Sequence, residues 1–110
     1  MIHYLIKIKD EQDGQDHYFI WSNNADAPIT SSFTREEAPA MLEQDYRNAG
    51  AMPRPEIGVI LSRVAENGIA YLYESGHTDQ TLEGLLEWNR AGPNESSLRG
   101  QEIIKQYRGF

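Results

Sequence analysis

The chain has 110 residues, of which 39% are hydrophobic and 25% are charged, and this is typical of one ordinary globular domain over residues 1–110. Ten basic residues against seventeen acidic ones give a formal net charge of −7. An acidic chain argues against binding to long nucleic acid, for which a basic stripe is expected. The absence of cysteine from the sequence excludes a disulfide framework and a thiolate metal site.

The charge is unevenly distributed. Residues 1–87 carry six basic and fifteen acidic side chains, whereas residues 88–110 carry four basic and two acidic ones. The basic excess after residue 87 leaves room for a small anion held by a few arginines. The apolar run over residues 2–8 is interrupted by lysine and is too short for a signal peptide or a membrane span. We therefore expect a cytoplasmic protein without a membrane contact.

The chain begins with the alternation of a β-hairpin. Residues 2–9 alternate apolar and polar side chains, which is strand periodicity. Asp13-Gly14 is the expected reversal point, and the aromatic residues 17–21 form the return strand. Residues 22–33 show neither helix nor strand periodicity, and a connection this long is often functional.

A helix is predicted after this connection. Thr34 and Glu37 have the spacing of a capping box, and apolar side chains follow at helical spacing until Gly50. Pro39 predicts a bend close to the start of this helix. Residues 57–65 and 69–74 are then predicted as strands, because Asn67-Gly68 between them is the strongest short hairpin signal.

Two helices are predicted in the last third of the chain. Leu82, Leu85 and Leu86 share one helix face, and the pair Gly92-Pro93 predicts that this helix stops at residue 91 or 92. We expect Thr78 or Asp79 to cap its start. A short helix over residues 100–108 places Ile103, Ile104 and Tyr107 on the core.

The predicted fold class is α+β with the element order ββαββαα. Two hairpins form a four-stranded antiparallel sheet, and the helices pack on one face of it. The other face would then be partly uncovered. Because the strands carry aromatic side chains, this favours a homodimer or a larger homo-oligomer.

The sequence offers little support for catalysis. It has no cysteine, no serine in a nucleophile-elbow pattern and no glycine-rich phosphate loop after a predicted strand. His3, His17 and His77 fall in three different elements. The four carboxylates of residues 10–16 lack the spacing of a known calcium loop, and a metal site from His3, His17 and an acid is only a weak signal. We expect no enzyme, metal or cofactor.

Two patches are better candidates for binding a small molecule. Trp21 leads into a polar loop that contains Asp26 and Thr30, and Trp88-Asn89-Arg90 ends the predicted helix over residues 82–91. Together they would supply a stacking platform, an amide for a base edge and a guanidinium for a phosphate. The alternative is that both tryptophans are core residues and that Arg90 only pairs with Glu87.

Arg54 lies between two prolines, which would hold an exposed cation at low entropic cost. A solvated loop arginine is the alternative. The candidate ligand-binding residues are thus Trp21, Asp26, Thr30, Arg54, Trp88, Asn89, Arg90 and Arg108.

The two patches resemble the Thoeris anti-defence sponges, small phage proteins that bind a cyclic ADP-ribose signal made by TIR-domain enzymes. The resemblance covers the patches and the element order, and the family's arginine in the final helix has two competing matches here, Gln106 and Arg108. It implies a non-enzymatic homo-oligomer that sequesters a cyclic ADP-ribose isomer or a cyclic oligonucleotide, with Trp21 and Asn89 on the base and ribose. Phosphate contacts would come from Arg54, Arg90 or Arg108. The patches are Trp21-Ser22, Asp26-Ala27-Pro28-Ile29-Thr30 and Thr34-Arg35-Glu36-Glu37, and Leu82 with Asn89-Arg90-Ala91-Gly92-Pro93-Asn94-Glu95 and Leu98.

The acidic balance supports a second hypothesis, an inhibitor or immunity protein that blocks a nuclease or a nucleic-acid-binding partner by protein–protein contact. Such an inhibitor needs Asp10, Glu11, Asp13 and Asp16 on one continuous face. A nucleotide-binding protein needs arginines and aromatic side chains that converge on one pocket.

Overall fold

The computed structural model describes residues 2–50, 53–91 and 100–109, without the side chains of residues 88–91. Its centre is a four-stranded antiparallel sheet in the order β3-β2-β1-β4. The α+β class with a four-stranded antiparallel sheet is therefore confirmed. The strands are β1 (His3–Lys9), β2 (Asp16–Ser22), β3 (Ala27–Pro28) and β4 (Ile69–Tyr71).

The predicted N-terminal hairpin is confirmed. β1 and β2 pair from His3 opposite Ser22 to Lys9 opposite Asp16, and Gly14 in the turn adopts a positive φ of 71°. The connection after β2 folds back along it, because β3 pairs with the end of β2 and Phe33 bridges to Tyr18.

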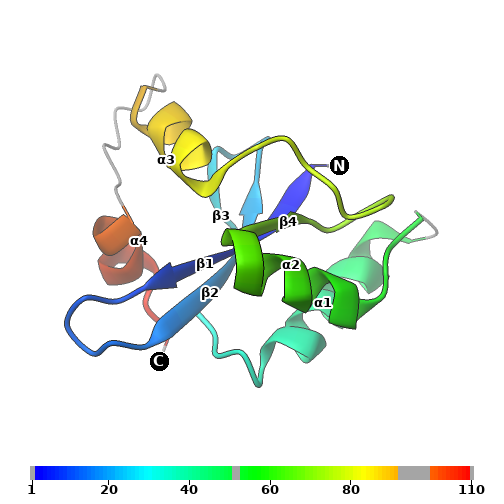
Figure 1. Cartoon of the computed structure of the whole chain (residues 1–110), viewed down its shortest axis with the longest axis horizontal. Helices are drawn as coiled ribbons and strands as arrows, with labels where there is room; N and C mark the ends of the chain where they lie inside the picture. Colours follow the sequence, from blue (N-terminus) through cyan, green and yellow to red (C-terminus); the bar gives the residue numbers. More distant parts are fainter. Residues whose placement is uncertain (1, 51–52, 92–99, 110) are drawn as a thin grey trace.

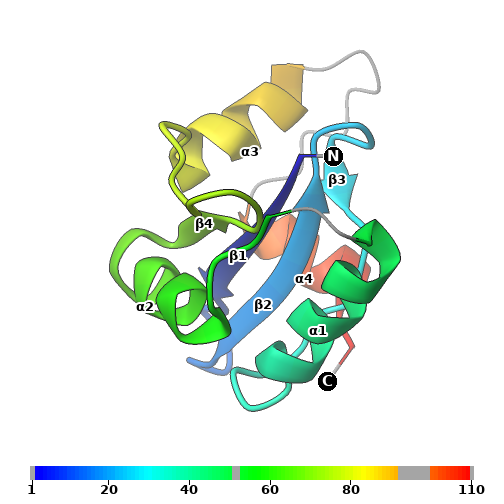
Figure 2. The same cartoon turned by 90° about the vertical axis from the view of Figure 1, so that its right-hand side faces the viewer.

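Helices cover both faces of this sheet. In Figure 1 the strands separate α1 (Ala38–Ala49) and α2 (Ile57–Asn67) from α3 (Leu82–Ala91) and α4 (Gly100–Tyr107). In Figure 2, α1 lies in front of the sheet and α4, drawn fainter, lies behind it. The prediction that the helices pack on one face of the sheet holds for α1 and α2. Helices α3 and α4 lie against the other face. The uncovered aromatic face from which we predicted a homo-oligomer is therefore not present among the described residues.

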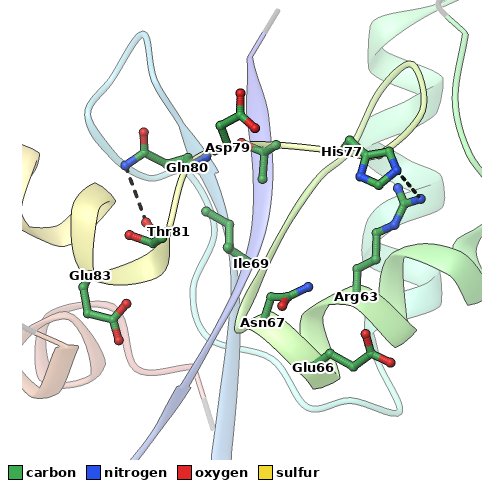
Figure 3. Close-up of a pocket in the computed structure, with 11 residues that line it drawn as sticks. Arg63, Glu66, Asn67, Ile69, His77, Asp79, Gln80, Thr81 and Glu83 are labelled. Atoms are coloured by element: carbon green, nitrogen blue, oxygen red, sulfur yellow. Dashed lines mark hydrogen bonds between the residues drawn. The ribbon is translucent and has the colours of Figure 1, made fainter.

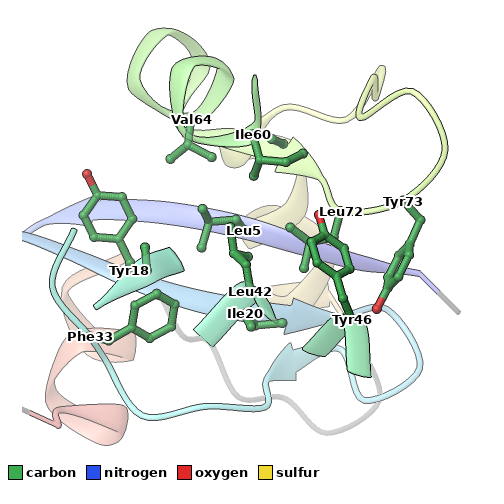
Figure 4. Close-up of a cluster of buried hydrophobic side chains, with 12 residues drawn as sticks. Leu5, Tyr18, Ile20, Phe33, Leu42, Tyr46, Ile60, Val64, Leu72 and Tyr73 are labelled. Carbon is green, nitrogen blue, oxygen red and sulfur yellow. The ribbon is translucent and has the colours of Figure 1, made fainter. Parts of the chain in front are cut away.

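Two clusters of buried side chains correspond to these two layers. Figure 4 shows the first cluster, in which Ile60 and Val64 of α2 and Leu42 of α1 pack over Leu5 and Ile20 of the sheet. The second cluster joins the opposite side of the strands to α3 and α4. Its buried members are Tyr4, Ile6, Ile8, Phe19, Trp21, Ile69, Leu85, Ile103 and Ile104.

The predicted second hairpin is wrong, and with it the order ββαββαα. Residues 57–67 form α2, whose apolar positions Ile57, Ile60 and Val64 have helical spacing, so that Ile60 and Val64 are fully buried. Gly68 does not form a two-residue hairpin turn: its φ of 77° and ψ of −5° are left-handed, and its N–H donates to the Val64 carbonyl at 2.8 Å. It is the C-terminal cap of α2. The strand that follows pairs with β1 instead.

The capping box before α1 is confirmed. The Thr34 N–H donates to Glu37 Oε1 at 2.9 Å, and the Glu37 N–H donates to Thr34 Oγ1 at 3.2 Å. The helix itself begins at Ala38, so Pro39 occupies its first turn, where the missing N–H costs little. The C-terminal cap of α1 is Gly50, as predicted, with a φ of 78°.

The last two helices are partly described. α3 is described as far as Ala91, and the predicted stop at Gly92-Pro93 lies outside the described residues. Its cap is Thr81 rather than Thr78 or Asp79, because Thr81 Oγ1 accepts the Gly84 N–H at 2.9 Å. Ile103 and Ile104 of α4 are buried as predicted. Among the helices described, none is long and apolar enough to cross a membrane.

Candidate functional site

The segment over residues 72–81 leads from β4 to α3 and contributes lining residues to two pockets. It is anchored on α2 at Gly76, which is buried and has a φ of 78°. A Cβ at Gly76 would collide with the Arg63 side chain and approach Ile60 Cδ1 and Pro55 Cγ to 3.2 Å each. Only glycine fits this approach of the segment to α2.

The first pocket, which we call the Asp26 pocket, has a volume of about 450 Å³. It joins the turn between β2 and β3 to the start of α3. Asn23 at one end of this turn is fixed by donating its N–H to the Ile2 carbonyl at 3.0 Å, and Asp26 adopts a positive φ of 50°. The described residues that line it are Asn23, Asp26, Gln80, Gly84 and Leu85.

The lining of the Asp26 pocket combines two amides, one carboxylate and one apolar side chain. Gly84 opens it from the helix side, since a Cβ there would lie 2.8 Å from Gln80 Nε2 and 2.9 Å from Thr81 Oγ1. Asn23 and Gln80 can each donate and accept hydrogen bonds, whereas the Asp26 carboxylate only accepts them. This donor and acceptor set suits a small polar ligand with hydroxyl or amino groups.

The second pocket, which we call the loop pocket, has a volume of about 420 Å³ and lies between α2, β4 and the start of α3 (Figure 3). Arg63 and His77 lie together at one end of it, with Arg63 Nη2 3.4 Å from His77 Nε2. Arg63 also donates to the Ser75 carbonyl. Its described lining residues are Arg63, Glu66, Asn67, Ile69, Gly76, His77, Thr78, Asp79, Gln80, Thr81 and Glu83.

Trp21 and Thr30, which we predicted to bind the ligand, have structural roles in the fold. Trp21 is fully buried in the second cluster, and its Nε1 has no hydrogen-bond partner among the described residues. A side chain in this position is not an exposed stacking platform. Thr30 Oγ1 accepts the Ile20 N–H at 3.1 Å and so holds the connection against β2.

The two predicted arginines that the structure describes lie elsewhere, each beside a carboxylate. Arg54 is 3.7 Å from Glu43 and lies over the Tyr46 ring, 4.8 Å from its centroid. Burial raises the pKa of Tyr46 to about 12, against the opposing effect of the Arg54 charge. Arg108 Nη2 donates to Asp10 Oδ2 at 2.6 Å. The arginines therefore do not converge with Trp21 on one pocket.

Trp88, Asn89 and Arg90 form the last turn of α3, and their side chains lie outside the described part of the chain. Of the two segments that the sequence singled out, the turn with Asp26 does line a pocket. It does so together with the start of α3, at Gly84 and Leu85, whereas Trp88-Asn89-Arg90 lies at the other end of that helix and is not among the lining residues described. The sequence did not lead us to Asn23 and Gln80. The available signal was Gly84, because a glycine inside a predicted helix can mark the close approach of another segment.

A second group that the sequence did not predict is a buried network around Asp45. Asp45 accepts hydrogen bonds from His3 Nδ1 at 3.0 Å and from the Tyr73 hydroxyl at 2.5 Å. Burial and the neighbouring Asp45 charge raise the pKa of Tyr73. The partners are distant in the sequence, and the network ties β1, α1 and the segment after β4 together.

Comparisons of the chain with protein-family models, with curated proteins and with solved structures found no match. Support for a function therefore comes from the geometry of the pockets and from the residues that line them.

Proposed function

We propose that this protein is a non-enzymatic binding protein that sequesters a cyclic nucleotide immune signal, with the nucleoside part held in the Asp26 pocket. The observation that carries the proposal is the convergence of the turn at Asp26 and helix α3 on one cavity of about 450 Å³. This volume lies within the range of small-molecule sites. Of the lining residues, Asp26 belongs to the patches that resemble the Thoeris anti-defence sponges, and Gly84 and Leu85 lie on the helix that carries the second patch.

The chemistry of the lining supports a nucleoside. The amides of Asn23 and Gln80 suit the mixed donors and acceptors of a base edge, and Leu85 offers apolar contact to a ring. The Asp26 carboxylate suits ribose hydroxyls, which donate hydrogen bonds to it. Because Asp26 is negative, a phosphate would lie on the side of the pocket away from it.

We further propose that the protein acts in the cytoplasm as a homo-oligomer. The protein would act in the cytoplasm, which is the host cytoplasm if a phage encodes it, and keep the signal from an effector protein. A homodimer or larger homo-oligomer would have to form outside the covered sheet faces. Ile29, which follows the edge strand β3 and is 47% exposed, is a described apolar residue available for it.

Calorimetric titration with cyclic ADP-ribose isomers and cyclic oligonucleotides tests the proposal. Asp26→Asn is expected to weaken binding by about 1–3 kcal/mol, the cost of an unsatisfied buried partner. Asp79→Asn, the same change in the loop pocket, is the control and should bind as the parent does. Ligand recovered chemically unchanged after heating the complex distinguishes sequestration from hydrolysis. Absence of binding to the parent by every nucleotide would overturn the proposal.

The acidic inhibitor is a second candidate, favoured by the loop pocket. Glu66, Asp79 and Glu83 line this pocket, and Arg63 is the only lysine or arginine among its described lining residues. The charge suits a basic side chain from a protein partner. On this hypothesis an arginine-rich peptide would bind with strong salt dependence, and Glu66→Gln with Glu83→Gln would weaken it. The hairpin gives the inhibitor hypothesis less support, because Asp10 is buried beside Arg108 and does not lie on an exposed acidic face.

A further inference from the structure

The tip of the β1–β2 hairpin gathers two carboxylates and one imidazole. Asp10 directly follows β1, Asp13 lies in the turn, and His17 is the second residue of β2. His17 is fully buried and Asp10 is 3% exposed, so two of the three groups are held by the fold. Their metal-binding atoms all lie within 4.8 Å of one another.

The distances within this group resemble those between ligands of one metal ion. His17 Nε2 is 3.3 Å from Asp13 Oδ2 and 3.8 Å from Asp10 Oδ2. Two ligands bound at about 2.1 Å with tetrahedral or octahedral angles are separated by about 3.0–3.4 Å. Small movements of Asp13, which lies in an exposed turn, are therefore enough to complete a site.

Both carboxylates are oriented toward the centre of the group by the backbone. Asp10 Oδ1 accepts the Gln12 N–H at 2.9 Å, and Asp13 Oδ1 accepts the Gln15 N–H at 2.8 Å. The second oxygen of each is thereby directed to His17. Hydrogen bonds of this kind fix the ligands of metal sites in proteins.

A separate observation is that a cation from another element already lies at this centre. Arg108, which follows α4, places Nη2 2.6 Å from Asp10 Oδ2 and 3.6 Å from Asp13 Oδ2. The two oxygens nearest the imidazole are therefore the oxygens that the guanidinium contacts. Arg108 is 47% exposed, so its side chain can leave toward solvent when another cation enters.

We propose that Asp10, Asp13 and His17 bind a divalent transition-metal ion, Zn²⁺ or Mn²⁺, in exchange for the guanidinium of Arg108. Imidazole with carboxylates suits these ions, whereas Ca²⁺ and Mg²⁺ prefer oxygen ligands alone. The ion would use Asp10 Oδ2, Asp13 Oδ2 and His17 Nε2, with water in the remaining positions. This site is distinct from the Asp26 pocket and does not depend on the proposed function.

Titration of the EDTA-treated full-length chain with Zn²⁺, Mn²⁺ and Mg²⁺ tests the site. We expect one ion of Zn²⁺ or Mn²⁺ per chain, little response to Mg²⁺, and a shift of the His17 imidazole resonances on adding Zn²⁺. Asp13→Asn is expected to weaken binding at least about tenfold, as loss of a ligand does. Arg108→Gln is expected to strengthen it several-fold, because the competing cation is removed.

Controls separate this site from adventitious binding. Asp16→Asn changes an exposed acid on the same hairpin, and His77→Ala removes an exposed imidazole elsewhere, so both should bind as the parent does. Circular dichroism confirms that each variant folds. Equal affinity of Asp13→Asn and the parent, or weaker binding by Arg108→Gln, would overturn the proposal and leave the cluster as an internal ion-pair network.

Discussion

At the scale of single residues, Asp45 shows how a buried charge is accommodated in this protein. It is almost fully buried on α1, and it accepts hydrogen bonds from both His3 and Tyr73. Buried carboxylates are stable only when they are paired and hydrogen-bonded. The Tyr73 ring also packs edge-on against Tyr46, with ring centroids 5.5 Å apart. The tyrosines around Asp45 are therefore held in their neutral forms.

The first prediction concerns alkaline pH. Burial raises the pKa of Tyr46 to about 12 and also raises the pKa values of Tyr18, Tyr71 and Tyr73 above the ordinary value of 10.0. Their stabilising contribution is complete below pH 10, where the tyrosines of the unfolded chain are neutral too. It declines as the pH rises from about 10 toward 12, because only the unfolded chain loses these protons.

Tyrosinate absorbance and circular dichroism recorded together from pH 9 to pH 12 check this. Of the six tyrosines, we expect Tyr46 and Tyr73 to ionise only as the helical signal is lost, and Tyr18 and Tyr71 to ionise above the ordinary pKa of 10.0. Ionisation of all six near pH 10 with an intact helical signal would contradict the buried positions of Tyr46 and Tyr73.

At the scale of elements, α2 depends on Gly68 for its end. The glycine adopts the left-handed conformation after the last helical residue, and its N–H closes the final turn on Val64. A Cβ there would be only 3.4 Å from Leu82 Cδ2, an ordinary contact, so the cost of a side chain is conformational. The same Asn-Gly pair that favours a hairpin turn serves here as a helix cap.

Gly68→Ala is therefore expected to lower the free energy of unfolding by about 1–2 kcal/mol, the penalty of a left-handed residue with a Cβ. Gly58→Ala in the same helix is the matched control. A Cβ at Gly58 would meet no atom of the described residues within 4 Å, so this change should stabilise the helix slightly. Urea unfolding measures both. Equal effects of the two substitutions would contradict the left-handed cap.

Helix α3 provides a test that separates binding from folding. In Gly84→Ala the new Cβ enters the Asp26 pocket, displaces the flexible end of Gln80 and presses on the capping oxygen Thr81 Oγ1. The helix gains up to about 1 kcal/mol from alanine, which offsets the strain at the Thr81 cap. We expect an almost unchanged melting temperature with weakened nucleotide binding in calorimetry. A variant that melts normally and binds as tightly as the parent would remove Gly84 and Gln80 from the site.

The elements also show how far the sequence predicts this fold. The first hairpin, the capping box at Thr34 and the apolar face of α4 follow from local patterns and were predicted correctly. α2 was missed because its β-branched residues and the Asn-Gly pair favour a hairpin locally, while its packing over Leu5 decides for a helix. The Asp26 pocket and the pair of His3 and Asp45 depend on contacts between distant segments, which spacing alone does not predict.

At the scale of the whole molecule, the two-sided sheet changes the expectation about assembly. Tyr4 and Tyr18 lie on opposite faces of the sheet and are both buried under helices. The Asp26 pocket is formed within one chain by its described residues. Ligand binding therefore does not require a second copy, although the proposed assembly includes one.

Light scattering on size-exclusion chromatography at high micromolar concentration tests the proposed assembly. A homodimer gives twice the chain mass of 12.5 kDa. Ile29→Asp places a charge at the exposed apolar residue beside the edge strand and should then favour the monomer. A parent mass of 12.5 kDa would overturn the homo-oligomer and leave the Asp26 pocket unaffected.

The most direct test of the proposed function is a titration of the ¹⁵N-labelled protein with cyclic ADP-ribose isomers and cyclic oligonucleotides, followed by NMR. Our account predicts saturable shifts for at least one of these ligands. The shifts should concentrate on the backbone amides of Asn23, Asp26, Gln80, Gly84 and Leu85, the residues that line the Asp26 pocket. Shifts centred on the loop pocket or on the hairpin tip, or no shifts with any nucleotide, would contradict it.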